Sequence, residues 1–522
     1  MVNLSNFLRL SLAAFAVGVS SLPTVAKDFY VSQSAAGNGN AMSPENAASP
    51  GWFNSTENWG QSKEQIGPGD TVHLIGTITT ALQVQASGAP GNPITILFDP
   101  GASMQSPVWP AETGAIDANS NAYITIDGGA RGMIGGPTGT PGLANGFIEN
   151  TANGTDLAFH SKSIFILVPE ARHVTVRNLG LYNLYVRTSP VDITPASGPK
   201  KDWSAIVSVN SSGEHRSNLL VTNCVIHDAL CGLLALYGPN CADFEYSHCT
   251  VYNCNWGGIC GDSNRWASMM GLLVHDNYFH DFANWDDDTG VNFFHHDGFF
   301  AWAMSGGAMS RVRMYNNLVG PNFGMHTAGG LFIQGWVGDV AFYNNVLREN
   351  ANDKAWDGLI YINPFPDIAS TYSALNNTFV GGGVGMAIYY GPHVTPKHTL
   401  HLLQTINVEN NLVLGVGTAV GLYGITEAAK LNIDFNLYHD LRSQRQFSYS
   451  TGDYSIFKGF SQWRKLGYDA NGTDLDPKLG AGYVPGASSP ALGAGANLSS
   501  FFTTDMAGAA RPANGGWNIG AY

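Results

Sequence analysis

A short motif recurs along most of this chain and restricts its fold more than any other feature. Each copy has alternating apolar residues, then an Asn, then another apolar residue two positions later. Nine segments carry it, at 174–183, 219–228, 244–253, 272–281, 312–321, 340–349, 372–381, 406–415 and 431–440. The motif Asn is Asn178, Asn223, Asn277, Asn317, Asn345, Asn377, Asn411 or Asn436, and His248 takes its place in one copy. Such repetition indicates an array of stacked structural units.

The pattern within each copy predicts strands, because apolar and polar residues alternate with period two. A second strand is expected after the Asn, at 232–238, 257–260, 297–303, 329–335, 357–363 and 385–391. Parallel strands need a crossover connection. The closest copies are separated by only 25 residues (Asn411 to Asn436) to 34 residues (Asn377 to Asn411), which leaves no room for crossover helices. The chain is therefore expected to coil.

This arrangement resembles the right-handed parallel β-helix of the pectate-lyase-like superfamily, over nearly all of the chain after residue 26. In that fold a turn Asn stacks on its copies in neighbouring coils and hydrogen-bonds along the ladder. The openings "FYVSQSAAGNGNAMSPENAASP" and "IGPGDTVHLIGT" and the closing "SIFKGFSQWRKLGYDANGTDLDPKLG" and "RPANGGWNIGAY" look like the ends of secreted β-helix proteins. The resemblance implies an all-β solenoid, a single-stranded right-handed parallel β-helix with capped ends.

Four regions are expected along the chain. They are a signal peptide at 1–26, an N-terminal cap with the first coils at 27–110, the parallel β-helix at 111–440, and a closing region with a short helix at 441–522. Regular coils are predicted from about residue 70 to 440, with one internal column made of Asn223, Asn277, Asn317, Asn345, Asn377 and Asn411.

The signal peptide is predicted from Arg9, the apolar run at 10–22 and the small residues Thr24 and Ala26. The run is shorter than a membrane-spanning helix requires, so no membrane span is expected. The mature protein is therefore predicted to be secreted, in the extracellular space or the periplasm.

The balance of charge argues against some partners. The chain has 25 basic and 39 acidic residues, a net charge of −14. Nucleic acid is excluded as an expected partner, because phosphate binding needs clustered Lys and Arg. A highly anionic polymer is disfavoured less strongly, because a local basic pocket or a bound cation can overcome the net field.

All six cysteines fall between Cys224 and Cys260, and no CxxC pair is present, which argues against a structural zinc site. Cys224 and Cys249 each follow the motif position directly, so they are expected on adjacent coils, near the reach of a disulfide. A disulfide and a stack of free thiols are both compatible with this spacing.

Three consecutive coils are predicted to carry enlarged loops at one corner. From the motif residue to the glycine that opens the next strand, the count is 9 residues after Asn223 and His248, but 21 after Asn277 and 13 after Asn317 and Asn345. Long loops within regular repeats usually mark the binding face. In pectate-lyase-like enzymes this corner borders the strand that lines the substrate cleft.

These loops and the adjoining strands contain residues suited to binding and cleaving a polysaccharide, the expected substrate. Carboxylates and imidazoles transfer protons, and aromatic rings stack on sugars. The candidate catalytic residues are Asp297, Asp357, His295, His296 and His326. The candidate substrate-binding residues are Trp285, Trp302, Gln334, Trp336, Lys354, Trp356 and Tyr361. No cofactor is expected to be required, although Asp286, Asp287 and Asp288 could contribute to a calcium (Ca²⁺) site.

Two of the carboxylates suggest a mechanism. Alignment of the strands on Gly298, Gly330 and Gly358 predicts that Asp297 lies over Gly329, and Gly329 over Asp357. Two coils at ~4.8 Å each separate the backbones by about 9–10 Å. Side-chain tilt can then bring the carboxyl groups into the ~6.5–9.5 Å range of inverting glycosidases.

A secreted polysaccharide-cleaving glycoside hydrolase is therefore the first hypothesis. Two alternatives stay open. One is a polysaccharide lyase or uronate epimerase acting on a uronic-acid polymer, for which Lys354, Arg348, His295 or His296 and the 286–288 loop could supply base and charge. The other is a non-catalytic carbohydrate-binding adhesin with the same fold.

Overall fold

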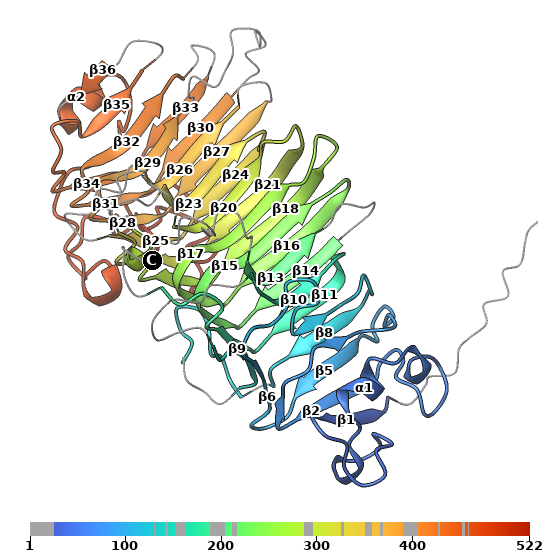
Figure 1. The fold of residues 1–522 in the computed structure, drawn as a ribbon. Helices are drawn as coiled ribbons and strands as arrows, with labels where there is room; N and C mark the ends of the chain where they lie inside the picture. The colour runs from blue at the N-terminus through green and yellow to red at the C-terminus, as the bar shows by residue number, and fades with distance from the viewer. Residues whose placement is uncertain are drawn as a thin grey trace, which may run out of the picture.

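The computed structural model is an elongated stack of coils (Figure 1). It describes residues 26–129, 131–140, 145–152, 162–187, 204–210, 217–286, 296–324, 328–349, 358–365, 369–389, 404–425, 429–450, 455–457 and 459–522. The predicted signal peptide, except for Ala26, lies outside these residues. Within the described residues, no helix has the length and apolar character needed to cross a membrane.

Each coil contributes one strand to a 13-stranded parallel sheet, called sheet A here. Its strands, in spatial order, are β1 (Asp28–Ser32), β2 (Thr71–Ile75), β5 (Ile94–Phe98), β8 (Ile124–Asp127), β11 (Arg172–Arg177), β14 (Ser217–Thr222), β16 (Cys241–Ser247), β18 (Ser268–His275), β21 (Ala308–Tyr315), β24 (Asp339–Tyr343), β27 (Ser370–Leu375), β30 (Gln404–Glu409) and β33 (Lys430–Asp434). Spatial order follows chain order, as coiling requires.

The other strands form two further rows, joined because β15 (Val225–Tyr237) and β17 (Thr250–Asp262) run through both. Row B follows the Asn turn and contains β3 (Thr77–Ile78), β6 (Ser103–Ser106), β9 (Phe147–Asn150), β12 (Gly180–Tyr182), β19 (Tyr278–His280), β22 (Leu318–Val319), β25 (Val346–Arg348), β28 (Thr378–Val380), β31 (Leu412–Leu414) and β34 (Leu437–His439). Row C contains β4 (Leu82–Gln83), β7 (Ile116–Asp117), β10 (Ile164–Val168), β13 (Ala205–Asn210), β20 (Asp297–Ala303), β23 (Gly329–Gly335), β26 (Gly358–Pro364), β29 (Val384–Tyr389), β32 (Thr418–Tyr423) and β35 (Phe447–Tyr449).

The two ends depart from this pattern. The short helix α1 (Pro50–Phe53) lies between β1 and β2, and α2 (Phe460–Lys465) follows the last coil. The final strand, β36 (Ser455–Phe457), pairs antiparallel with β35. The parallel stacking therefore ends with β35.

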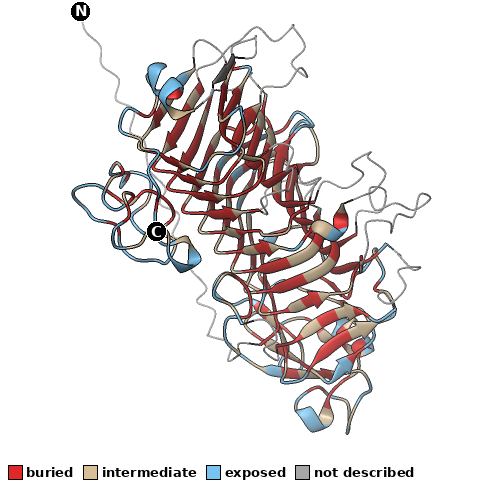
Figure 2. Cartoon of the chain, turned by 90° about the vertical axis from the view of Figure 1, so that its left-hand side faces the viewer, coloured by how far each residue is buried: buried red, intermediate tan, exposed pale blue. Residues whose placement is uncertain are grey.

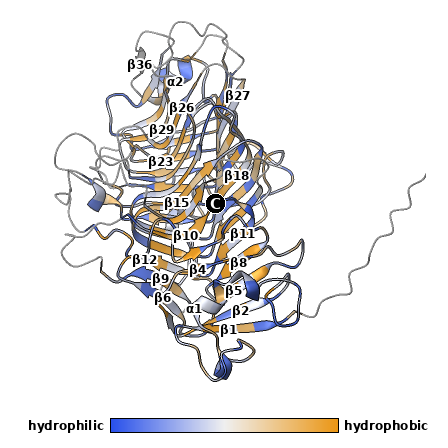
Figure 3. Cartoon of the chain, turned by 45° about the vertical axis from the view of Figure 1, so that its right-hand side comes forward, coloured by the Kyte–Doolittle hydropathy of each residue, from blue (hydrophilic) through white to orange (hydrophobic). Residues whose placement is uncertain are grey.

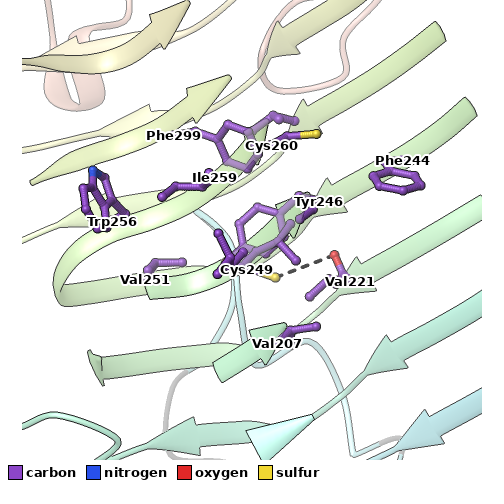
Figure 4. Packing of buried hydrophobic residues seen from close by; sticks show 14 of the residues in the cluster. Val207, Val221, Phe244, Tyr246, Cys249, Val251, Trp256, Ile259, Cys260 and Phe299 are labelled. Atoms are coloured by element: carbon purple, nitrogen blue, oxygen red, sulfur yellow. Dashed lines mark hydrogen bonds between the residues drawn. The ribbon is translucent and has the colours of Figure 1, made fainter. Parts of the chain in front are cut away.

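A single hydrophobic core fills the interior between sheet A and rows B and C. The strands carry most of the hydrophobic residues (Figure 3), and buried residues run along them while exposed residues gather in the loops (Figure 2). In the middle of the stack, Tyr246, Cys260 and Phe299 pack together, and the Cys249 Sγ faces the Val221 carbonyl oxygen at 3.9 Å (Figure 4).

The six cysteines are buried free thiols. The predicted adjacency of Cys224 and Cys249 is confirmed, because Val225 pairs with Thr250 and so places the preceding residues on neighbouring coils. The structure therefore has stacked thiols where the sequence allowed either thiols or a disulfide.

The internal Asn ladder is confirmed for Asn277, Asn317, Asn345, Asn377 and Asn411, and it continues to Asn436. Each side-chain amide donates to the Oδ1 of the next Asn at 2.9–3.1 Å. The last amide donates to Asp469 Oδ1 at 2.8 Å, which ends the ladder. These bonds satisfy polar groups that are shielded from water.

The prediction for Asn223 is wrong. Asn223 lies one column outward, where its amide donates to Asn178 Oδ1 at 2.7 Å, and Cys224 takes the internal position. Asn223 (φ 52°) and His248 (φ 51°) adopt the left-handed conformation. The turn thus has two neighbouring positions that favour Asn, one for its left-handed backbone and one for its amide, and the sequence motif does not separate them.

Two segments cover the outer turn column. Residues 131–140 pack on its first part, where Ile134 N–H donates to Asn223 Oδ1 at 2.8 Å. The C-terminal segment returns to the middle of the stack (Figure 1). There the Asn376 amide donates to the Asn518 carbonyl at 2.8 Å, and the Arg511 guanidinium donates to Asn344 Oδ1 at 2.8 Å.

Candidate functional site

Aromatic side chains form a stack on the outer side of row C. Phe300 stacks on Phe332 at 4.3 Å between ring centroids, and Phe332 stacks on Tyr361 at 4.7 Å. They meet because the register aligns them on three consecutive coils. Their chain neighbours Phe299 and Leu331 are fully buried in the interior, as the alternation of a strand requires.

A second outward column lies beside this stack and is more polar. Trp302, Gln334, Asn363, Tyr389 and Tyr423 are aligned on five consecutive coils. All except Trp302 are half-buried, so they are more accessible than the indole of Trp302. We call these five residues, together with Phe300, Phe332 and Tyr361, the row C face.

The structure thus brings Trp302, Gln334 and Tyr361 together as predicted neighbours, but two of them are mostly covered. Trp302 is 9% exposed and Tyr361 is 7% exposed. The indole of Trp302 lies over Gly261, where a Cβ atom would be 2.0 Å from the indole Cε2. These two rings therefore belong to the floor of the face, and its half-buried members are Phe300, Gln334, Asn363, Tyr389 and Tyr423.

Trp336 follows β23 and is half-buried, with its ring edge-on to Phe365 at 4.7 Å. Trp285 is fully buried, between Tyr185 at 5.2 Å and the Arg187 guanidinium at 5.4 Å. The expectation that Trp285 presents its ring to a sugar is therefore wrong. The ring instead packs beneath the loop that carries it.

Asp297 is the first residue of β20 and is fully buried. Its Oδ1 accepts a hydrogen bond from the backbone N–H of Gly329 at 2.8 Å, so the predicted placement of Asp297 over Gly329 is confirmed. A Cβ atom on Gly329 would lie 3.2 Å from the Cβ atoms of both Phe332 and Tyr361. A side chain in place of this glycine would therefore crowd Phe332 and Tyr361 of the row C face.

The predicted register is wrong by one residue in the next coil. Gly329 pairs with Gly358, not with Asp357. The alignment had matched Gly330 with Gly358, but Leu359 takes the position beside Gly330. A Cβ atom on Gly330 would lie 2.8 Å from the Leu359 carbonyl oxygen. Leu359 therefore occupies the register position that Gly298 and Gly330 occupy in the two preceding coils. The spacing of glycines along the sequence does not reveal this shift.

A buried polar cluster joins His296, the residue before β20, to Asp286 and Arg187. His296 Nε2 lies 3.0 Å from Asp286 Oδ1, and the imidazole is fully buried. The Arg187 guanidinium, also fully buried, donates to the Asp286 carbonyl oxygen at 2.7 Å and to the Asn284 carbonyl oxygen. This arginine is about a hundred residues from its partners in sequence, so the sequence carried no signal for it.

Seven of the predicted site residues lie outside the described residues. They are Asp287, Asp288, His295, His326, Lys354, Trp356 and Asp357. Their roles stay predictions, and so does the calcium site, of which only Asp286 is described. Five members of the row C face are not among the sequence-predicted site residues, although period-two alternation combined with the coil register could have identified them: Phe300, Phe332, Asn363, Tyr389 and Tyr423.

Charged side chains are scarce on the row C strands. The strands β20, β23, β26, β29, β32 and β35 contain no Lys or Arg in their sequences, and Asp297 is their only acidic residue. The strands therefore offer neutral hydrogen-bonding groups, with a single carboxylate at one edge.

The sheet topology and the internal ladder identify the fold. The chain has a pectate-lyase-like parallel β-helix fold. No family model matches it, and no curated protein matches it in sequence. Its similarity to solved structures is remote.

Three of those structures are pectate lyase Pel9A, XylC in complex with xylose, and the GH136 lacto-N-biosidase from Eubacterium ramulus. The pectate lyase is 12% identical, with 96% of each chain covered and a TM-score of 0.41. XylC is 9% identical, with 95% of this chain and 98% of that chain covered and a TM-score of 0.41. The lacto-N-biosidase is 12% identical, with 78% and 68% covered and a TM-score of 0.31.

Proposed function

We propose that this protein is an exported enzyme that cleaves a polysaccharide by glycoside hydrolysis at the row C face. The observation that supports this proposal is the line of amide and phenol groups over an aromatic floor, with the Asp297 carboxylate at its edge. Sugars are bound by such combinations of apolar rings and fixed polar groups.

The face suits an extended chain. Gln334, Asn363 and Tyr389 recur once per coil, at ~4.8 Å intervals, so each can hydrogen-bond a different part of one polymer. The amides both donate and accept, as a hydroxyl-rich ligand requires. A polymer lying along the β-helix axis would therefore meet similar groups on successive coils.

In the proposed chemistry, Asp297 and Asp357 act as the two carboxylates. One protonates the leaving glycosidic oxygen while the other activates a water molecule. Gly358, which directly follows Asp357 in sequence, lies two coils from Asp297, so the backbones of Asp297 and Gly358 are about 9–10 Å apart. His296 would hold the start of β20 through its contact with Asp286, and His295 or His326 would hold substrate hydroxyls.

Hydrolysis is preferred to elimination because of the charges on the face. Elimination from a uronate needs a base and a cation or Arg that neutralises the substrate carboxylate. The row C strands contain no Lys or Arg, and the chain carries a net charge of −14. A neutral polysaccharide therefore fits this face better than a uronic-acid polymer does. Export rests on the signal peptide expected at residues 1–26.

A panel of neutral and uronic polysaccharides tests the proposal. Each is incubated with the protein, and both new reducing ends and the absorbance of unsaturated products are measured. Reducing ends without unsaturated products support hydrolysis. Both signals together would establish a lyase and overturn the hydrolase proposal. Binding without either signal would overturn the hydrolase proposal in favour of the adhesin or the uronate epimerase, neither of which breaks the polymer chain.

A further inference from the structure

A second groove lies on the outer face of sheet A, on a different side of the β-helix from the row C face. Its volume is about 670 Å³, within the range of ligand sites in proteins. Seven consecutive coils contribute to it: Pro93 in the segment before β5, and then the six strands from β8 to β21, which carries Arg311 and Arg313. Six coil spacings make it about 29 Å long, so its shape is long and narrow.

The groove follows a crease in sheet A. Six consecutive coils place a left-handed residue at the same register position, with φ between 54° and 97°: Tyr123, His173, Asn218, Asp243, Gly271 and Arg311. The next four coils have Asp339, Thr371, Thr405 and Lys430 at this position, and none of them is left-handed.

The left-handed conformation is unfavourable for side chains other than glycine, and especially for bulky ones such as Tyr123 and Arg311. It bends the strand and re-aims the side chain, as a β-bulge does. The crease is confined to the coils that line the groove. The unfavourable backbone and the concavity therefore coincide, a pattern often found at ligand sites.

The crease presents a varied set of side chains. Tyr123 and His173 stack at 4.4 Å, and the Asn218 amide lies 2.8 Å from His173 Nδ1. Asp243 Oδ1 faces Arg311 at 3.9 Å across Gly271, whose missing side chain leaves the gap open. A parallel column supplies Thr125, Thr175, Leu220, Glu245, Leu273 and Arg313.

The charges of this lining balance. Asp243 and Glu245 oppose Arg311 and Arg313, so the groove has no net preference for an anion or a cation. Carboxylates and guanidinium groups, together with an amide and threonine hydroxyls, hydrogen-bond hydroxyl groups in many orientations. Tyr123 and the two leucines supply apolar surface. An uncharged, hydroxyl-rich and extended ligand matches all three properties.

We propose that this groove is a second carbohydrate site, which binds a neutral polysaccharide chain without cleaving it. The choice of a carbohydrate ligand rests on the proposed function of the row C face. The groove would hold the protein on its substrate while another segment of polymer reaches the row C face. Two sites on one rigid body raise the effective concentration of substrate at the cleaving site.

Glycine substitutions test the proposal without harming the backbone. Tyr123→Gly, Asp243→Gly and Arg311→Gly each remove a groove side chain at a position that glycine tolerates well. We expect each variant to keep its melting temperature and to bind neutral polysaccharide about tenfold more weakly. Affinity is measured by gel retardation in soluble xylan, glucomannan and β-glucan, with polygalacturonate as the anionic comparison.

Lys430→Gly is the matched control, because Lys430 is exposed and occupies the same register position beyond the crease. It should leave retardation unchanged. Turnover of a short soluble oligosaccharide should also be unchanged in the groove variants. This assay tests the cleavage proposal separately, because it does not depend on binding of polymer in the groove. Equal retardation of the groove variants, the control and the parent protein would overturn the proposal. Stronger retardation by polygalacturonate than by the neutral polymers would overturn it as well.

Discussion

The carboxylate of Asp297 is bound to the backbone N–H of Gly329 on the next coil, at 2.8 Å. This bond ties two coils together at the edge of the row C face. It also orients the carboxylate, because a backbone donor occupies one oxygen. A catalytic role of Asp297 and a role as a link between coils can therefore be distinguished, because the first affects turnover and the second affects stability.

We expect Asp297→Asn to lower turnover at least ~10²-fold with little change in melting temperature, because general acid–base catalysis contributes that much. Initial rates on the substrate found in the polysaccharide panel measure it. Asp357→Asn should behave in the same way.

Asp262→Asn is the matched control. Asp262 is also buried at a row C strand end, and its carboxylate accepts the N–H groups of Met304, Ser305 and Gly307. This variant should lose stability and keep its turnover when folded. Near-full activity of Asp297→Asn would contradict the catalytic assignment.

The ladder predicts a second outcome. Asn345→Ala removes bonds to Asn317, Asn377 and the Met314 carbonyl and leaves buried polar groups unpaired. The free energy of unfolding should fall by about 2–4 kcal/mol. Urea unfolding measures it. Asn264→Ala, at a half-buried loop position, should cost less than about 1 kcal/mol, and an equal loss in both variants would argue against the ladder.

The cysteines make a third prediction. All six are buried, and burial raises the pKa of the Cys231, Cys249 and Cys254 thiols well above its usual range. A thiol reagent should therefore label none of them in the native protein and all six in urea without reductant. Labelling of only four in urea would show that one pair is bridged and would contradict the prediction of six free thiols.

A fourth prediction concerns pH. Burial and the neighbouring Asp434 raise the pKa of Glu409 in the folded protein. The contribution of Glu409 to stability is thus fully present below the pKa that its carboxyl group has in the unfolded chain. It is lost as the pH rises through the higher pKa of the folded protein, because the carboxyl group then ionises in a buried place beside Asp434. Glu409→Gln should raise the melting temperature at pH 7 and make no difference at pH 3. The exposed Glu64→Gln serves as the control, and an equal shift at both pH values would contradict the prediction.

The repeated alternation and the motif Asn were enough to determine a parallel β-helix and most of its internal ladder. Both depend on the two-residue alternation within each strand and on the repeated spacing of the motif along the chain, because a solenoid repeats the same contacts in every coil. The sequence also predicts enlarged loops at the corner before row C, because the length of a loop can be counted directly from the sequence.

Only the tertiary structure decided the register at places where the same residue type fits either of two neighbouring positions. Asn223 lies in the outer column and not the internal one, and Gly358 lies beside Gly329 and not beside Gly330. It also decided which rings are covered, since Trp285 is buried by Tyr185 and Arg187. The sequence does not predict the crease in sheet A either. Tyr123 and Arg311 are residue types without a preference for the left-handed backbone, so nothing distinguishes them from ordinary strand residues. In each case the deciding contacts join different coils, and such contacts exist only once the coils are stacked.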